Sequence, residues 1–223
     1  MSFVMDWERE TRTGTPEAVF CEGKRSKDID AILAAARARG QRLLLTRLAT
    51  DHYAALSPES RADLDFHPLS RTAISGDTPA PRDPSVAVVA AGTSDLPAAH
   101  EAARSLAFFG YNAPIVADVG VAGIWRLEAR IHDIESHAVV IAVAGMEGAL
   151  FSVLGGLIAQ PIIAVPTSNG YGVAQGGKAA LSSALATCAP GVTTVNIDNG
   201  FGAACAACRV LRLIQGKPTQ PRG

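Results

Sequence analysis

The sequence predicts an α/β protein: a doubly wound parallel sheet with a small amino-terminal α/β appendage. Five short β-rich runs follow Pro84, and each leads through a glycine-containing turn into a helical pattern. Such β–turn–α units in series require parallel strands joined by right-handed crossovers. A second observation is the stretch PAPRDP at residues 79–84, which is typical of a linker. We therefore expect two regions, residues 1–80 and residues 81–223.

The first region contains three predicted elements. The stretch SKDIDAILAAARARG predicts a helix that Ser26 caps and that ends at Gly40. The stretch QRLLLTRL predicts a strand, and the segment after Thr50 has a helical pattern. These residues hold no recognisable catalytic motif, so we expect the chemistry to reside in the second region.

The second region is expected to alternate five strands with five helices. The predicted strands are 86–90, 113–117, 138–143, 161–165 and 192–197, and the predicted helices are 96–109, 122–132, 147–159, 174–187 and 201–214. We expect a flavodoxin-like strand order for this sheet. Ligands of such sheets bind beyond the carboxyl ends of the strands, so the residues after each strand are the candidates for a site.

Composition narrows the classes of partner. The formal net charge of −1 gives no basic surface for nucleic acid. Hydrophobic residues make up 48% and charged residues 18% of the chain, which indicates a large core or burial between subunits, and we expect a homo-oligomer. The acidic amino terminus, MSFVMDWERE, does not resemble a secretory signal. Four cysteines are too few for a disulfide scaffold, so a cytoplasmic location is expected.

The stretch between His137 and Lys178 is apolar and carries one charged residue, Glu147. Its glycines and prolines divide it into pieces that are too short to cross a bilayer as a helix. We therefore expect buried strands and a buried helix here, and no membrane span.

The first predicted strand is followed by AAGTSD. Gly92 permits a tight turn, and Thr93, Ser94 and Asp95 stand at the start of the next helix. Free backbone N–H groups and hydroxyls at a helix start can bind a phosphate. The same residues could instead cap the helix, and the two roles are compatible. The dinucleotide motif GxGxxG is absent at this turn.

The second and third strands end at DVG and AGMEG. Asp118 and Gly120 either face a ligand or form a capped turn. Gly145 and Met146 precede Glu147 at the start of a predicted helix. A carboxylate there could complement the helix dipole. Because an isolated acid in apolar surroundings is costly, and such acids in clefts are candidate general bases, we favour a catalytic role for Glu147.

The fourth strand leads into TSNGYG, where Ser168, Gly170 and Gly172 predict a loop that lies against a ligand. Tyr171 in this loop can stack on a ring. The following GVAQGGKA nearly matches the phosphate-binding GxxxxGK[ST]. It ends in Ala179, which has no hydroxyl for magnesium, so we exclude a nucleoside triphosphatase.

The last two candidates are an acid–amide pair and a cysteine. Asp198 and Asn199 follow the fifth strand and could bind a ribose, a metal or a backbone turn. Cys188 ends the preceding helix, and a lone cysteine is usually a small core residue. The carboxyl end of a helix does not activate a thiol. A reactive Cys188 would therefore need a base, for which Glu147 is the candidate.

Together these motifs resemble one family. The stretches AAGTSDLPAAHEAA, DVGVAGIWRL, AGMEGAL, IIAVPTSNGYG, ATCAPGV and NIDNGFGAA resemble, in this order, the LarB family, the carboxylase/hydrolases of nickel-pincer nucleotide cofactor synthesis. The leader RTGTPEAVFCEGK is also similar to that family. The family's core is similar to aminoimidazole ribonucleotide (AIR) carboxylase. The histidine of that purine enzyme is missing, because DVGVAGI stands in its place.

The resemblance implies a reaction on nicotinic acid adenine dinucleotide. The pyridinium ring would gain a carboxylate from CO2, and hydrolysis of the phosphoanhydride would release AMP and pyridinium-3,5-biscarboxylic acid mononucleotide. Cys188 and Glu147 match the family's nucleophile and base, and a homo-octamer is implied. We expect Mg²⁺ to assist the hydrolysis, with Asp95 and Asp198 as candidate ligands. An AIR carboxylase or mutase, or a non-catalytic nucleotide-binding module, are the alternatives.

Overall fold

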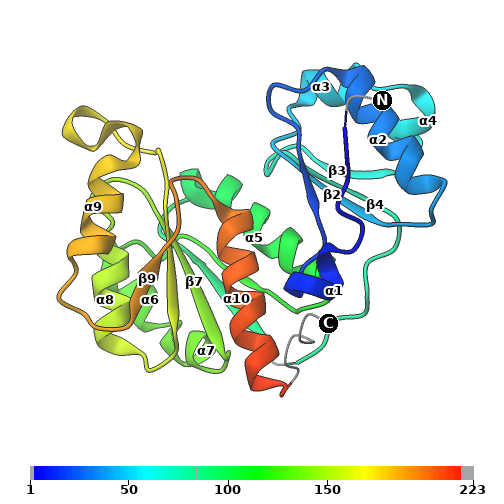
Figure 1. Cartoon of the computed structure of the whole chain (residues 1–223). Helices are drawn as coiled ribbons and strands as arrows, with labels where there is room; N and C mark the ends of the chain where they lie inside the picture. Colours follow the sequence, from blue (N-terminus) through cyan, green and yellow to red (C-terminus); the bar gives the residue numbers. More distant parts are fainter. Residues whose placement is uncertain (1–2, 84, 217–223) are drawn as a thin grey trace. The chain divides into compact units, whose positions relative to one another are not determined.

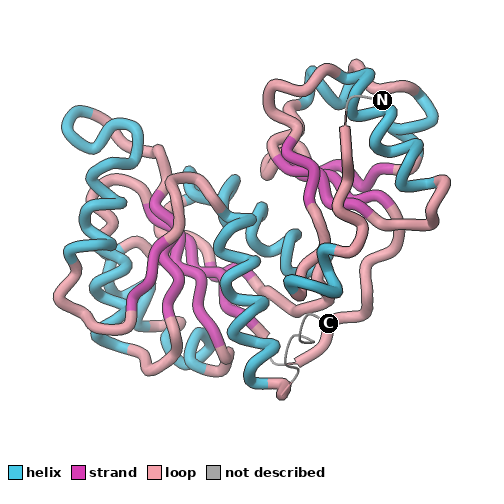
Figure 2. The backbone as a smooth tube through the Cα atoms, viewed as in Figure 1, coloured by secondary structure: helices cyan, strands magenta, loops and turns pink. Residues whose placement is uncertain are grey.

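The computed structural model describes residues 3–83 and 85–216. The chain divides into two compact units, the first ending at Pro79 and the second beginning at Ala80. The boundary thus falls within the PAPRDP stretch. Each unit has its own sheet, labelled in Figure 1 and coloured by secondary structure in Figure 2, and each is described by itself.

The first unit is built on a four-stranded mixed sheet in the order β1-β2-β4-β3. Its strands are β1 (Ala18–Phe20), β2 (Leu43–Thr46), β3 (Leu64–His67) and β4 (Thr72–Ser75), and its helices are α1 (Arg9–Thr13), α2 (Ser26–Arg37), α3 (Thr50–Ala54) and α4 (Pro58–Ala62). Helix α2 buries residues at helical spacing, namely Ile29, Ile32, Leu33 and Ala36. The predicted cap at Ser26 is wrong, because Arg25 occupies the cap position and no side chain caps the helix.

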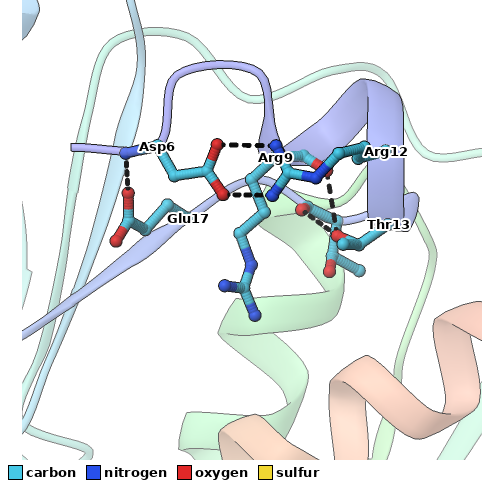
Figure 3. A network of polar contacts seen from close by, with 6 residues as sticks. Asp6, Arg9, Arg12, Thr13 and Glu17 are labelled. Carbon is cyan, nitrogen blue, oxygen red and sulfur yellow. Dashed lines mark hydrogen bonds and ion pairs between the residues drawn. The ribbon is translucent and has the colours of Figure 1, made fainter. Parts of the chain in front are cut away.

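A network of polar contacts joins residues before, within and after α1 (Figure 3). The Arg12 guanidinium donates to both carboxylate oxygens of Asp6, and the Asp6 backbone N–H donates to Glu17. The hydrogen bond from Arg12 lowers the pKa of the Asp6 carboxyl group. The Thr13 hydroxyl donates to the Arg9 and Thr15 carbonyls. Since the ion pair is exposed to solvent, we assign it the role of shaping this turn rather than of stabilising the unit.

The second unit is a five-stranded parallel sheet in the order β6-β5-β7-β8-β9. The strands are β5 (Val86–Ala90), β6 (Ile115–Val116), β7 (Val139–Ala144), β8 (Ile162–Pro166) and β9 (Val192–Thr194). This order confirms the predicted flavodoxin-like, doubly wound fold. The three central strands are buried along their whole length, as parallel strands covered on both faces require.

Helices cover both faces of this sheet. Helices α5 (Leu96–Phe108) and α10 (Gly200–Ile214) pack against each other on one face, and α8 (Ala149–Leu157) and α9 (Lys178–Ala186) lie on the other (Figure 1). A Cβ atom at Gly200 would lie 2.3 Å from the Ala98 carbonyl oxygen, so glycine permits the close α5–α10 crossing. In the described part of the chain, none of the helices is both long and apolar enough to cross a membrane.

Several predicted boundaries differ from the structure. The predicted helix 122–132 is two short helices, α6 (Ile124–Glu128) and α7 (Ile131–Glu135), preceded by the 3-10 turn η2 (Val121–Gly123). The predicted helix 174–187 begins only at Lys178, because Gly176 and Gly177 have positive φ and keep the residues before it in a kinked 3-10 turn, η3 (Gly172–Gly177). Both outer strands are shorter than predicted.

Candidate active site

A cavity of about 600 Å³ opens where β5, β7 and β8 end. Its walls come from the turn after β5, the loop after β6, the AGMEGAL turn after β7 and the TSNGYG loop after β8. This is the sheet edge at which parallel α/β folds bind ligands. The predicted site residues that line it are Gly92, Ser94, Asp95, Asp118, Gly120, Gly145, Met146, Glu147, Gly170 and Tyr171.

A buried carboxylate, Asp95, ties the first strand end to the fourth. It lies in the 3-10 turn η1 (Thr93–Asp95), and only 5% of its surface is exposed. Oδ2 accepts a hydrogen bond from the Gly92 backbone N–H at 3.0 Å. Oδ1 accepts from the Thr167 hydroxyl at 2.6 Å and from the Asn169 amide at 3.2 Å. These contacts make Asp95 a group that fixes the two loops, while the exposed Ser94 beside it faces the cavity.

The AGMEGAL turn lies directly against the TSNGYG loop. The Met146 backbone N–H donates to the Asn169 carbonyl at 2.7 Å, and Met146 has a left-handed φ of 52°. A Cβ atom at Gly145 would lie 2.2 Å from the Asn169 carbonyl oxygen and 2.7 Å from the Thr167 hydroxyl. Glycine is therefore required at position 145 by close backbone approach.

Replacing Gly145 by alanine is expected to lower the free energy of unfolding by about 2 kcal/mol, because the backbone of the facing loop must move away. The matched control is Gly156→Ala in helix α8, where an added Cβ meets nothing within 4 Å. That change is expected to raise the free energy by about 0.5–1 kcal/mol. Urea denaturation of both variants checks this, and equal midpoints would contradict the predicted clash.

An arginine that the sequence analysis did not select also lines the cavity. The Arg126 Nη1 donates to the Asp118 carboxylate at 2.8 Å. The Arg126 Nε is buried and has no hydrogen-bond partner in the structure. Arg126 follows Asp118 by eight residues in DVGVAGIWRL, and only the turn through η2 into α6 brings the two together. The pair places a fixed cation at the cavity wall.

Glu147 lines the cavity, but not in the environment that the sequence predicted. We expected an isolated carboxylate in apolar surroundings. The structure places Glu147 in the turn before α8, where its side chain is exposed at the cavity. The apolar residues around it in the sequence are instead buried in β7 and in α8. Glu147 can therefore accept a proton from a bound molecule without the cost of a buried charge.

The remaining predicted residues lie outside the cavity lining. Thr93, Ser168 and Gly172 are exposed beside it. The Asp198 carboxylate accepts a hydrogen bond from the Ser168 backbone N–H at 2.8 Å. Asn199 is the cap of α10, where its side chain accepts from the Gly202 N–H at 2.8 Å. Of the three roles left open for Asp198 and Asn199, the structure shows the backbone turn.

Cys188 lies away from the cavity, in the turn between α9 and β9. Val192 at the start of β9 pairs with Ile162 at the start of β8. The turn therefore lies at the amino edge of the sheet, whereas the cavity lies at the carboxyl edge. The structure does not bring Cys188 and Glu147 of one chain together, and the Cys188 side chain is exposed.

The two aspartates predicted to hold Mg²⁺ do not converge. Asp95 already accepts three hydrogen bonds, and Asp198 holds the Ser168 backbone outside the cavity. Within residues 3–83 and 85–216, no group of three or more His, Cys, Asp or Glu side chains could hold a metal ion. The pair does not fit a magnesium site, so no step is assigned to a metal held by it.

Comparisons with known proteins agree with this architecture. Residues 2–77 match the model of the LarB/PurE-like N-terminal domain, and residues 85–220 match that of AIR carboxylase. A protein of Methanocaldococcus jannaschii that is described as uncharacterized is 36% identical to this chain over 223 residues. The match covers 94% of this chain and 84% of that protein. The crystal structure of a Treponema denticola PurE2 variant has a TM-score of 0.50 at 22% identity, covering 61% of this chain and 84% of that one, and it shows the same fold.

Proposed function

Since the chain is a LarB-like member of the AIR carboxylase family, we propose that it carboxylates nicotinic acid adenine dinucleotide on the pyridinium ring with CO2. We further propose that it hydrolyses the phosphoanhydride to give AMP and pyridinium-3,5-biscarboxylic acid mononucleotide. Family membership itself supports a carboxylase-family enzyme. The substrate and the hydrolysis are the parts that this proposal adds.

The lining of the cavity is the observation that carries the proposal. Apolar residues, including Val121 and Leu150, line it together with the charged Arg126 and Glu147. Among the described residues that line it there is no histidine, whereas the purine enzyme is expected to place one after its second strand. An apolar wall suits CO2, and a single cation suits an anionic ring substituent. This combination favours carboxylation of a pyridine carboxylate over the purine reaction.

The substrate has groups that match particular parts of the site. The exposed start of η1 and α5 offers backbone N–H groups and the Ser94 hydroxyl to a phosphate. The partly exposed guanidinium of Arg126 offers a charged hydrogen bond to the ring carboxylate. Tyr171, 78% exposed at the cavity, offers an aromatic face to the ring or the base.

The chemistry requires a nucleophile because a pyridinium ring is electron-poor and cannot attack CO2. A thiolate that adds beside the ring nitrogen converts the ring into a neutral dienamine, whose neighbouring carbon is nucleophilic. That carbon forms a bond to CO2 and then loses its proton to a base. The sulfur departs with its electron pair, and the aromatic cation is restored. Cys188 is proposed as the thiolate, supplied by another copy of the chain because it lies at the opposite edge of the sheet from the cavity of its own chain. Glu147 is proposed as the base that takes the thiol proton, releases it to water, and then takes the proton of the ring carbon.

Mass spectrometry tests the proposal directly. The protein is incubated with nicotinic acid adenine dinucleotide, ¹³C-bicarbonate and magnesium, and the expected products are AMP and a mononucleotide that carries the label. Parallel samples contain AIR, or lack magnesium. Absence of both products would overturn the proposal, and labelled carboxylation of AIR would assign the purine reaction instead.

Replacing Arg126 by glutamine is expected to raise the KM for nicotinic acid adenine dinucleotide by about ten- to hundredfold, because a charged hydrogen bond contributes about 1.5–3 kcal/mol. The control is Arg130→Gln, which removes an arginine that pairs with Asp133 on the surface at 2.8 Å. That variant is expected to keep the KM of the wild type. Steady-state kinetics check both, and an unchanged KM for Arg126→Gln would contradict its role in binding.

A further inference from the structure

One residue of the loop after β8, Asn169, joins two other turns that surround the cavity. Its side-chain amide donates to the Ser94 carbonyl at 2.7 Å, in the turn after β5. Its backbone carbonyl accepts from the Met146 N–H at 2.7 Å, in the turn after β7. Asn169 itself lines the cavity. A single residue thus connects the turn that is proposed to hold a phosphate with the turn that carries Glu147.

The connection between Asn169 and Ser94 holds the Asn169 side chain in one orientation. The same amide nitrogen lies 3.2 Å from Asp95 Oδ1 and 3.2 Å from the Thr167 hydroxyl oxygen, and both of these residues are buried. All of these neighbours accept hydrogen bonds, and only the nitrogen end of an amide can donate them. Since Ser94 is exposed at the cavity, a phosphate bound there meets a turn to which Asn169 is already attached.

The connection between Asn169 and Met146 holds the backbone that leads into Glu147. The Gly148 N–H donates to the Gly145 carbonyl at 3.0 Å and closes a turn whose central residues are Met146 and Glu147. Met146 has a left-handed φ of 52°, which is unfavourable for a residue with a side chain and persists where surrounding contacts hold it. The hydrogen bond from its N–H to Asn169 is such a contact, so its loss would let the turn relax.

The position of the Glu147 carboxylate depends on this backbone. The side chain is exposed at the cavity, and no hydrogen bond or ion pair joins it to another of the described residues. A general base must lie within about 3 Å of the group whose proton it takes. A misplacement of about 1 Å can lower a rate by about a hundredfold. The turn that Asn169 holds therefore sets how well Glu147 acts as a base.

We propose that Asn169 is a positioning residue that couples the two turns, so that a phosphate bound at the Ser94 turn holds Glu147 where it takes protons. This inference rests on the proposed function. The substrate carries a phosphate and the pyridinium ring on one ribose, so one molecule fills the phosphate turn and presents its ring to the base. Nicotinic acid riboside lacks the phosphate and leaves the coupling unused, and its carboxylation is expected to be slow.

Kinetics with and without the phosphate test the coupling. Asn169→Ala is expected to lower kcat for carboxylation of nicotinic acid adenine dinucleotide by about ten- to hundredfold, with a change in KM of less than about threefold. The slow carboxylation of nicotinic acid riboside should be the same in the variant and the wild type. The matched control is Asn112→Ala, which removes an exposed asparagine outside the cavity lining and should leave both rates unchanged. An equal loss on both substrates would mean a merely structural role and would overturn the proposal.

Amide hydrogen exchange measures the coupling without catalysis, with inorganic phosphate as the probe. In the wild type, phosphate is expected to slow exchange by about fivefold or more at residues 92–96 and also at residues 145–148, where the Met146 N–H reports its bond to Asn169 directly. In Asn169→Ala, the slowing at 92–96 should remain and the slowing at 145–148 should be lost.

The outcomes separate this proposal from the one on which it rests. A wild type in which phosphate slows exchange at 92–96 alone, or at neither turn, overturns the coupling without any variant. Equal slowing at 145–148 in Asn169→Ala would mean direct binding there, and loss at both turns would mean that Asn169 builds the phosphate turn itself; each overturns the coupling as well. If exchange shows the coupling while the wild type makes neither AMP nor labelled mononucleotide, the proposed function fails and the coupling remains.

Discussion

Cys188→Ala is expected to lower the rate of carboxylation of nicotinic acid adenine dinucleotide by about a thousandfold or more, as removal of a catalytic nucleophile does in other enzymes. Without sulfur the pyridinium ring stays electron-poor and cannot attack CO2. Incorporation of ¹³C-bicarbonate into the mononucleotide measures the loss. Because the side chain is exposed, the free energy of unfolding should change by less than about 0.5 kcal/mol.

Cys205→Ala is the matched control for this variant. Cys205 lies on helix α10 and does not line the cavity, so its replacement should leave carboxylation at the wild-type rate. If Cys188→Ala retained the full rate, covalent catalysis by this cysteine would be wrong. A loss of rate that accompanies unfolding, seen by circular dichroism, would also count against a chemical role.

Asp95→Ala is expected to lower the free energy of unfolding by about 3 kcal/mol and to abolish activity. The carboxylate is buried and accepts hydrogen bonds from Gly92, Thr167 and Asn169. Removing it leaves the Gly92 N–H and the Thr167 hydroxyl without this acceptor, whereas the Asn169 amide keeps the Ser94 carbonyl at 2.7 Å. Each buried unsatisfied group costs about 1–3 kcal/mol. The loops after β5 and β8 would lose two of their links and hold the cavity walls less firmly. Urea denaturation measures the change.

The control for Asp95→Ala is Asp133→Ala, which removes an aspartate that is exposed and paired with Arg130. A surface ion pair of this kind contributes about 0–1 kcal/mol. The two variants should therefore have clearly different urea midpoints at equal slopes. Similar midpoints would show that the buried carboxylate does not hold the two loops together.

The location of the site follows from the sequence because it depends only on the fold class. Once five β–turn–α units are recognised, the carboxyl ends of the strands must share one edge. That argument placed Gly92, Gly145 and Tyr171 at the cavity without any knowledge of their contacts. The sheet order could be predicted for the same reason, since short parallel crossovers leave few alternatives.

The contacts inside the site could not be predicted, because they join residues that are distant in sequence. Asp95 accepts a hydrogen bond from Thr167, which lies 72 positions away in the sequence. No local sequence pattern at either residue predicts this contact. Glu147 appears isolated in an apolar stretch of sequence, yet a single turn carries its side chain out to the cavity. Arg126 becomes part of the site because the turn through η2 into α6 brings it to Asp118. Cys188 lies at the other edge of the sheet, because it follows a crossover helix that runs back to the start of the next parallel strand.

The outer strands of the second sheet are β6, with two residues, and β9, with three. A long open edge would offer unpaired N–H and C=O groups to another chain and would favour aggregation or continuous sheets. Edges this short give an incoming strand little to pair with. The second sheet therefore disfavours fibre-like growth by strand pairing, and contacts between copies through this unit would have to be made by its helices and loops.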